Sequence, residues 1–423
     1  MKQTEVGLIP EDWKIVTIGD VATIVGGGTP STSVSNYWNG EIQWFTPAEL
    51  NDSKKYVSKS LRTITKTGLQ GSSARLLPKG TILLTTRASI GITAILKNVA
   101  CTNQGFQSLI AKENCYNEFL YYVIPFIKKE MLARASGSTF AEISAKKLST
   151  ITFPFPPLAE QHRIAKALSD VDAVINTIEK LIQKKKDIKQ GAAQNLLTGK
   201  KRLPGFATAT KFKQTELGEI PDDWEVKNIN KECIIKARIG WQGLKSTEYL
   251  DSGDYILVTG TDFDNGFINW KSCSYVTKWR FDQDKNIQIK QGDVLVTKDG
   301  TIGKIAFLDS IPMQGTLNSG VFVVRPKSSD KIDSVFLSFI FKSKWFDSFL
   351  EQITSGSTIV HLYQKDFIKF NFPLPSKSEQ IAIANVLSSM DREIETLNTK
   401  LEKYRDLKTA MMQQLLTGKI RLR

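Results

Sequence analysis

Two groups of cationic, amide and hydroxyl residues in loops are the residues of this sequence whose chemistry suggests a ligand. Lys and Arg side chains neutralise phosphates, and Arg, Asn, Gln and Lys side chains in loops can hydrogen-bond to base edges. The first half of the chain contributes Lys54, Lys55, Arg62, Arg87, Arg134, Ser136, Ser138 and Thr139. The second half contributes Arg238, Gln242, Lys245, Lys278, Arg280, Lys298, Ser355, Ser357, Thr358 and His361. Both groups include a Ser-Gly-Ser-Thr run, which suits phosphate but could equally be a structural turn between helix and strand.

Motifs for catalysis or metal binding are not recognisable in the sequence. The Gly26-Gly27-Gly28 run leads into Thr-Pro-Ser and not into a periodic helix, as a phosphate or adenosyl loop requires. A Pro-Asp…Glu-x-Lys pattern at 221–227 has the residues of a nuclease motif at too short a spacing, and the first half of the chain does not keep it. With two histidines and four cysteines, none of them in a C-x-x-C pair, a zinc site is not expected. We therefore predict no catalytic residue, no metal and no cofactor in this chain.

The composition is that of a globular protein with a polyanionic partner. The chain has 423 residues, of which 41% are hydrophobic, and its net charge is +14. This balance excludes a disordered or collagen-like chain, and the positive charge favours nucleic acid over an acidic membrane. Neither a signal peptide nor an apolar run long enough for a membrane-spanning helix is found, so no membrane partner is expected. Four scattered thiols fit a reducing, cytoplasmic location.

An internal repeat organises the elements that must position these residues. Residues 2–13 (KQTEVGLIPEDW) return as residues 213–224 (KQTELGEIPDDW), with nine of twelve positions identical. The offset is 211 there and reaches 219 by the Ser-Gly-Ser-Thr runs, after which it stays fixed up to QNLLTGK and QQLLTGK. The chain is therefore one unit written twice.

Each copy begins with a globular part, residues 1–156 and 206–372, and ends with a helical part, residues 157–205 and 373–423. Short β-branched runs bounded by turn residues predict strands, and one longer stretch in each copy predicts helix. The expected strands include 63–66, 81–86, 255–258 and 321–324, and the expected helices are 117–132 and 334–350. The class predicted for each globular part is mixed α/β (α+β).

The helical parts carry matched apolar seams at a 4-3-4-3-4 spacing, which is typical of a coiled coil. The seam residues are Ile164, Leu168, Val171, Ile175, Ile178 and Ile182, and then Ile383, Leu387, Met390, Ile394, Leu397 and Leu401. Ser376 and Glu379 predict a capping box at the start of the second helix, whereas Pro157 starts the first. Gly199 and Gly418 are placed as the glycines that end the helices.

Two copies of one unit normally pack about a pseudo-twofold axis, which makes their helices antiparallel. A helix of ~40 residues is roughly 60 Å long, so we expect the pair to hold the two globular parts apart. The C-terminal tail repeats the segment that leads into the second copy. The chain ends should therefore lie close together in a nearly circular layout.

The residues resemble a known family over essentially the whole chain. The segments that carry the likeness are Gly27–Ser31, Tyr37-Trp38 with Ile42-Gln43-Trp44, Pro154–Gln161 and the duplicated Leu-Leu-Thr-Gly ending. In this order they resemble the specificity (S) subunit of type I restriction–modification systems. The second copy departs from the pattern, since it reads Gly240-Trp241-Gln242-Gly243 in place of the Gly-Gly-Thr-Pro run.

The resemblance implies that residues 1–156 and 206–372 are target recognition domains, each reading one half of a bipartite double-stranded DNA sequence. The helices would then be spacers that set the distance between half-sites and dock methyltransferase (modification) subunits, two of them. These subunits would bind S-adenosylmethionine, and restriction motor–nuclease subunits with ATP and Mg²⁺ would join through them. Two alternatives stay open at this point: a stand-alone nuclease or methyltransferase with an unrecognised site, and a structural adaptor for acidic proteins.

Overall fold

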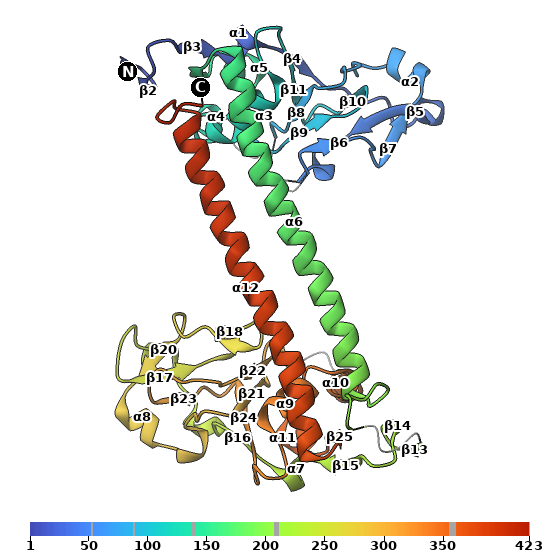
Figure 1. Ribbon diagram of the computed structural model, residues 1–423, viewed down its shortest axis with the longest axis vertical. Helices are drawn as coiled ribbons and strands as arrows, with labels where there is room; N and C mark the ends of the chain where they lie inside the picture. The colour runs from blue at the N-terminus through green and yellow to red at the C-terminus, as the bar shows by residue number, and fades with distance from the viewer. Residues whose placement is uncertain (52–53, 88, 137–140, 207–210, 355–360, 423) are drawn as a thin grey trace. The chain divides into compact units, whose positions relative to one another are not determined.

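The computed structural model describes the chain except residues 52–53, 88, 137–140, 207–210, 355–360 and 423. It divides into two compact units, each of which is described below by itself (Figure 1). The first consists of Met1–Leu181 with Leu397–Arg423, and the second of Ile182–Thr396. The boundary between the units falls within both long helices, so each unit contains one globular head and a segment of each helix.

The head of the first unit is built on a five-stranded sheet with the order β4-β11-β8-β9-β6 and a three-stranded sheet with the order β10-β5-β7. Two further strand pairs, β1-β2 and β3-β12, complete it. The strands are β1 Lys2–Thr4, β2 Gly7–Ile9, β3 Lys14–Thr17, β4 Ala22–Gly26, β5 Trp38–Phe45, β6 Tyr56–Val57, β7 Arg62–Ile64, β8 Ile82–Leu84, β9 Thr93–Leu96, β10 Ala100–Thr102, β11 Gln107–Ala111 and β12 Thr152–Phe155.

The head of the second unit has the same plan, but its large sheet has four strands in place of five and a separate strand pair, β18-β19, is added. Its sheets have the orders β16-β24-β21-β22 and β20-β17-β23, with the pairs β13-β14, β15-β25 and β18-β19. In both three-stranded sheets one neighbour of the central strand is parallel and the other antiparallel. The strands are β13 Phe212–Thr215, β14 Gly218–Pro221, β15 Glu225–Asn228, β16 Cys233–Ala237, β17 Tyr255–Val258, β18 Phe263–Asp264, β19 Phe267–Ile268, β20 Ser274–Val276, β21 Val294–Thr297, β22 Ile305–Phe307, β23 Gly315–Leu317, β24 Val321–Pro326 and β25 Asn371–Leu374.

Short helices cover the sheets, and two stretches predicted as single helices are each broken in two. Residues 117–132 form α3 (Asn117–Phe126) and α4 (Lys128–Arg134), because Pro125 near the end of α3 cannot donate a backbone hydrogen bond. Residues 334–350 lie in α9 (Ser334–Ile340) and α10 (Lys344–Thr354), and the chain turns at Ser343 between them. The remaining short helices are α1 Ile18–Val21, α2 Lys66–Gln70, α5 Ala145–Ser149, α7 Ile229–Glu232, α8 Lys278–Asp282 and α11 Gln364–Phe367.

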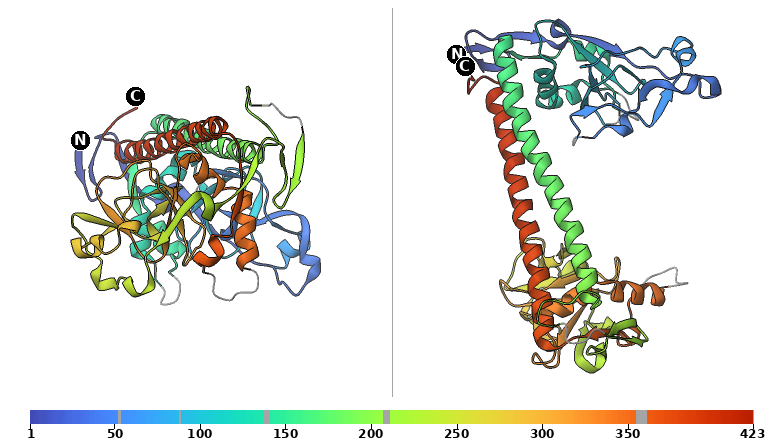
Figure 2. Two further views of the ribbon diagram at one scale, coloured as in Figure 1. Left: turned by 90° about the horizontal axis from the view of Figure 1, so that it is seen from below. Right: turned by 45° about the vertical axis from the view of Figure 1, so that its right-hand side comes forward.

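The two long helices are α6 (Leu158–Leu197) and α12 (Lys377–Leu415). Within each unit their segments lie side by side and antiparallel, as Figures 1 and 2 show. In the first unit Arg405 pairs with Glu179 and Lys408 with Asp172, at 2.8 and 2.7 Å. In the second unit the partners are Lys185 with Glu393 and Lys189 with Asp391. As residue numbers rise along one helix they fall along the other, which confirms the predicted antiparallel pairing in each unit.

The seam residues are buried or half-buried, but they do not all face only the other helix. Ile164 and Leu168 belong to the core of the first head, together with Leu415 and Leu416 from the end of α12. Ile383 and Leu387 belong to the core of the second head in the same way, together with Leu196 and Leu197. The seam is therefore a helix-to-helix contact in its later part and a contact between helices and head at its start.

The predicted helix ends are confirmed at the glycines and only half confirmed at the start of α12. Gly199 and Gly418 adopt φ values of +68° and +70°, where an L side chain is strained. The Glu379 backbone N–H donates to the Ser376 hydroxyl at 3.4 Å, which is one half of a capping box. The Glu379 carboxylate is instead bonded to Arg202 and Trp224.

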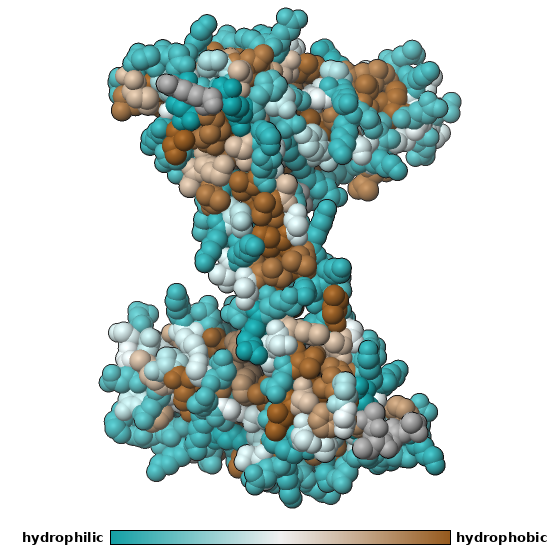
Figure 3. All heavy atoms as spheres, in the orientation of Figure 1, coloured by the Kyte–Doolittle hydropathy of each residue, from teal (hydrophilic) through white to brown (hydrophobic). Residues whose placement is uncertain are grey.

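Several large apolar side chains are exposed on the helices. In the first unit they include Val174, Leu181 and Leu407, and in the second Ile188 and Ile381. Ile188 and Leu407 are equivalent at the offset of 219. Figure 3 shows hydrophobic residues gathered along the helix segments next to the first head. In the described part of the chain, no helix is both long enough and apolar enough to cross a membrane.

Candidate nucleic-acid interface

A turn of the same construction joins two neighbouring strands of the large sheet in both heads, β8 to β9 in the first and β21 to β22 in the second. In the second head the Thr297 hydroxyl donates to the Thr301 carbonyl at 2.6 Å and accepts from the Lys304 N–H at 2.9 Å. In the first head the Thr85 hydroxyl bonds the Ser89 carbonyl and accepts from the Ile92 N–H in the same way. The backbone frame is thus shared, and the side chains that it carries are free to differ.

These two turns hold ion pairs of opposite polarity at equivalent positions. In the first head Arg87 on the turn pairs with Glu142, with 2.9 Å between Nε and Oε2. In the second head the equivalent residues are Asp299 and His361, and Oδ1 and Nδ1 lie 2.7 Å apart. The pair of Asp299 and His361 is ionic only when the histidine is protonated. The same contact therefore places a cation on the turn of one head and a carboxylate on the turn of the other.

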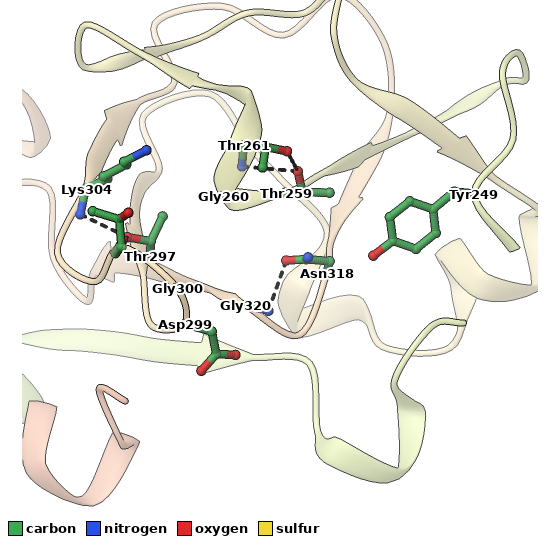
Figure 4. Close-up of a pocket in the computed structure, with 11 residues that line it drawn as sticks. Tyr249, Thr259, Gly260, Thr261, Thr297, Asp299, Gly300, Lys304, Asn318 and Gly320 are labelled. Atoms are coloured by element: carbon green, nitrogen blue, oxygen red, sulfur yellow. Dashed lines mark hydrogen bonds between the residues drawn. The ribbon is translucent and has the colours of Figure 1, made fainter. Parts of the chain in front are cut away.

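A hollow of about 420 Å³ opens beside Asp299 in the second head (Figure 4). Three loops line it: the one after β17 with Thr259 and Thr261, the turn between β21 and β22, and the turn after β23 with Asn318. Tyr249 presents its hydroxyl from the other side, toward Asn318 (Figure 4). Residues that carry hydroxyl, amide, ammonium and carboxylate groups thus line one space, and a lining of this kind can fix a polar ligand in one orientation.

The loop after β17 is a duplicated feature. Thr259 and Asp262 form a capping box, and the first head has the same box in Thr46 and Glu49. The turn after β23 is also duplicated, since Asn318 accepts from the Gly320 N–H as Asn103 accepts from the Gly105 N–H. The predicted site residues did not include this loop or this turn. The repeated T-x-x-E/D pattern was the sequence signal that could have found the loop.

The described candidates of the first head are mostly held by neighbours, and only Lys54 among them is exposed with no side-chain contact to another described residue. Lys55 is half-buried and pairs with Glu118 at 2.8 Å. Arg62 is exposed, and its guanidinium lies 3.6 Å from the centre of the Trp38 ring. The others are placed as follows: Arg87 with Glu142, Arg134 with Glu130 and Thr150, and Ser136 with Lys147; Ser138 and Thr139 lie outside the described residues.

The second head buries two of its candidates. Arg238 is 3% exposed and donates to the Leu317 carbonyl and to Thr316, and Gln242 is 6% exposed. Burial removes both side chains from the surface, and their residue types alone could not reveal this. The others are placed as follows: Arg280 with Glu248, Lys278 with Asp282, Lys245 exposed, and Lys298 and His361 with Asp299; Ser355, Ser357 and Thr358 lie outside the described residues.

One further set of side chains, missed by sequence reasoning, joins each head to the end of a long helix. Arg421 donates to both carboxylate oxygens of Asp12, at 2.8 and 2.7 Å, and to both of Glu160, at 2.8 Å. The Trp13 indole N–H donates to Glu160 at 3.0 Å. We call this set the first clasp. The carboxylates raise the pKa of the Arg421 guanidinium, so its charge is held firmly.

The second unit contains the equivalent set, the second clasp. Arg202 donates to both oxygens of Asp223, at 2.9 and 2.8 Å, and to both of Glu379. The Trp224 indole N–H donates to Glu379 at 3.1 Å. Every member corresponds to a member of the first clasp at the repeat offsets. The repetition extends from the sequence to individual hydrogen bonds.

Comparison with known proteins decides which family has this construction. The model of the type I restriction modification DNA specificity domain matches residues 10–190 and again residues 221–403. The chain belongs to this family. The resemblance drawn from the sequence is thereby confirmed, as are the mixed α/β heads, the two long helices and a role in DNA recognition rather than catalysis.

Named relatives agree. The type I restriction enzyme MjaIX specificity subunit of Methanocaldococcus jannaschii is 31% identical over 76% of this chain and 74% of its own length. The MjaVIII specificity subunit of the same organism is 28% identical over 98% and 94%. The crystal structure of the type I restriction-modification system S subunit from M. genitalium matches 98% of each chain with a TM-score of 0.60 at 15% identity, which supports the fold.

Proposed function

We propose that the chain reads an asymmetric bipartite DNA sequence, with one half-site for each head. The observation that carries this proposal is that the heads share topology and turn construction but differ in the side chains on those turns. Arg87 and Glu142 in one head stand where Asp299 and His361 stand in the other. Two heads with the same backbone turns but different side chains on them suit two different half-sites, whereas two identical heads would suit a palindrome.

We further propose that α6 and α12 set the number of base pairs between the half-sites and dock two methyltransferase subunits. Exposed apolar residues on the helices support docking, because large side chains such as Leu407 and Ile188 gain by being covered. Their equivalence by the repeat suggests two similar docking sites. Val174, however, is exposed where the second copy has Glu393, so the two sites are not identical.

Catalysis would then belong to the partners. In this proposal the methyltransferase subunits bind S-adenosylmethionine, and restriction subunits that use ATP and Mg²⁺ join through them, in the cytoplasm. This chain contributes positioning of DNA and holds no cofactor of its own. Phosphate contacts from exposed residues such as Lys54 and Arg62 would give binding that weakens steeply with salt.

The test is methylation-sensitive sequencing of DNA from cells that express the chain together with its methyltransferase subunits. We expect modification at one sequence made of two specified halves and an unspecified spacer, and none when this chain is omitted. A single contiguous site, or modification without sequence preference, would overturn the proposal. Methylation or cleavage of DNA by the purified chain alone, supplied with S-adenosylmethionine and Mg²⁺, would favour a stand-alone enzyme instead.

A further inference from the structure

The hollow beside Asp299 differs from its counterpart in the first head in the way that a specificity pocket should. Both heads build this region on the same capping-box loop and the same Asn-x-Gly turn. In the first head Pro47 packs close to Gly105, since a Cβ on that glycine would meet the proline ring at 2.6 Å. In the second head Gly260 stands in place of Pro47 and lines the hollow. The two heads thus share the backbone of this loop and turn, but they differ in the side chains that occupy the space between them.

The lining of the hollow selects among the groups that DNA can offer. A phosphate would meet the carboxylate of Asp299, which repels an anion. Asp299 is held in place by Lys298 at 3.1 Å and by His361 at 2.7 Å, and each of its oxygens keeps a further lone pair. A carboxylate so placed accepts a hydrogen bond from the exocyclic amino group of a base, as Asp and Glu accept from cytosine N4.

The candidates drawn from the sequence also converge on this place. Lys298 and His361 both contact Asp299, and His361 follows directly after the second Ser-Gly-Ser-Thr run. Lys304 and the hydroxyls of Thr259 and Thr261 complete a lining that offers donors as well as acceptors. Cations able to meet phosphate thus lie next to groups able to read a base.

We propose that this hollow is where the second head reads a base, and that Asp299 selects a base that presents its amino group in the major groove, adenine or cytosine, at one position of one half-site. The inference rests on the proposed function. It makes Asp299 and Thr261 specificity-determining residues that contact the edge of a base, with Lys298 and His361 as positioning residues for the carboxylate. In the first head the turn presents Arg87, a donor that favours guanine acceptors at the equivalent place.

The test uses the full chain with its methyltransferase subunits and a pool of DNA duplexes randomised at both half-sites. Asp299→Asn keeps the shape and replaces an acceptor oxygen by a donor, so we expect preference at one position of one half-site to relax by about tenfold. Thr261→Val should weaken preference in the same half-site, because its exposed hydroxyl is lost with little change of shape. The other half-site and the spacer should not change.

Asp330→Asn is the matched control, since Asp330 is an exposed aspartate of the same head outside the hollow and its replacement changes the net charge equally. Unchanged base preference in Asp299→Asn and Thr261→Val, with normal binding and melting, would overturn the inference. An equal effect of Asp330→Asn, or relaxation of both half-sites, would also overturn it. If the wild-type complex selected no bipartite site, the proposed function itself would fail, which is a separate result.

Discussion

Arg202 and Arg421 make the same set of contacts in the two units, and among the described residues each is the only cation paired with its buried glutamate. Glu379 and Glu160 are 1% and 2% exposed. A buried carboxylate that loses its partner retains the full cost of its desolvation. The two arginines are therefore structural groups, although a basic residue at a chain end would ordinarily be assigned to solvent or to DNA.

Arg421→Ala should lower the free energy of unfolding of the first unit by about 2–3 kcal/mol. The buried Glu160 carboxylate would lose its cationic partner and keep the hydrogen bond from the Trp13 indole. Arg202→Ala should do the same to the second unit. The measurement is urea denaturation followed by tryptophan fluorescence, since Trp13 lies in the first clasp and Trp224 in the second.

The control is Arg405→Ala, which removes exposed ion pairs with Glu179 and Glu402 and should cost no more than about 0.5 kcal/mol. A loss for Arg421→Ala as small as that of the control would show that the first clasp does not stabilise the unit.

At the same scale, residue type predicted the chemistry of candidate contacts but not their exposure. Arg238 and Arg280 have the same side chain and lie in the same head, yet Arg238 fills the interior beneath Thr316 and Arg280 is tied to Glu248. Arg238 comes directly after β16, whereas Arg280 lies in α8, and the neighbours that each position meets in the fold are not visible in the local sequence. Asp299 was overlooked because an acid is not an obvious DNA contact.

The elements were easier to predict where the signal is local and repeated. The ends of α6 and α12 follow from a glycine in a duplicated Leu-Leu-Thr-Gly run, and the seams follow from spacing alone. The break between α3 and α4 needed attention to Pro125. The participation of Ile164 and Ile383 in the head cores could not be read from spacing, because a seam residue is apolar whichever surface it meets.

The glycines that end the long helices provide a sharp element-scale prediction. A Cβ at Gly199 would lie 2.3 Å from Pro221 and one at Gly418 would lie 2.5 Å from Pro10, and both glycines have positive φ. Either Gly→Ala change should therefore destabilise its unit by at least about 1 kcal/mol, measured by thermal or urea unfolding.

Gly191 is the matched control, because it lies inside α6 and a Cβ added to it would meet nothing within 4 Å. Gly191→Ala should stabilise the protein by about 0.5–1 kcal/mol through helix propensity. If Gly199→Ala and Gly191→Ala had the same sign, the packing of the helix end against Pro221 would be refuted.

The contact between the first head and α6 should depend on pH. Burial alone would raise the pKa of Glu118 on α3, but hydrogen bonds from Lys55, from Tyr56 and from Ser169 of α6 outweigh it and hold the pKa below its ordinary value of 4.5. A folded-state pKa below the unfolded one gives stability that is present above the unfolded pKa and lost as pH falls through the folded pKa.

Glu118→Gln should therefore cost about 1 kcal/mol near neutral pH and progressively less below about pH 4.5. Urea denaturation of both proteins across that range measures it. A cost that stayed constant with pH would mean that the charge of Glu118 is not the source of the stability.

For the whole molecule, the repeat predicts that each head determines one half-site and that the helices determine the spacer, independently of one another. Replacing residues 206–372 by the equivalent domain of another member of the family should change one half-site and leave the other intact. Adding one heptad to α6 and one to α12 should change only the spacer. Both changes are measured by methylation-sensitive sequencing with the partner subunits present. If the spacer were unchanged in the longer protein, the helices would not set the distance between the half-sites.

The architecture was predictable because the sequence repeat shows each feature in both copies. The two copies have matching apolar seams, matching helix ends and globular parts of similar length. The hollow in the second head was not predictable, since it arises where three loops distant in sequence meet and where a single glycine replaces a proline. Gly260 in isolation says nothing about the space that it lines.

The first clasp also has a consequence for biosynthesis. The ribosome completes residues 1–156 long before it reaches Arg421, yet Leu415 and Leu416 belong to the core of that first head and Arg421 neutralises its buried Glu160. The head that is translated first thus receives these core residues only after the whole second head has been translated. A stop codon just before Leu415 would therefore damage the first head, and would leave the second head with its own clasp complete.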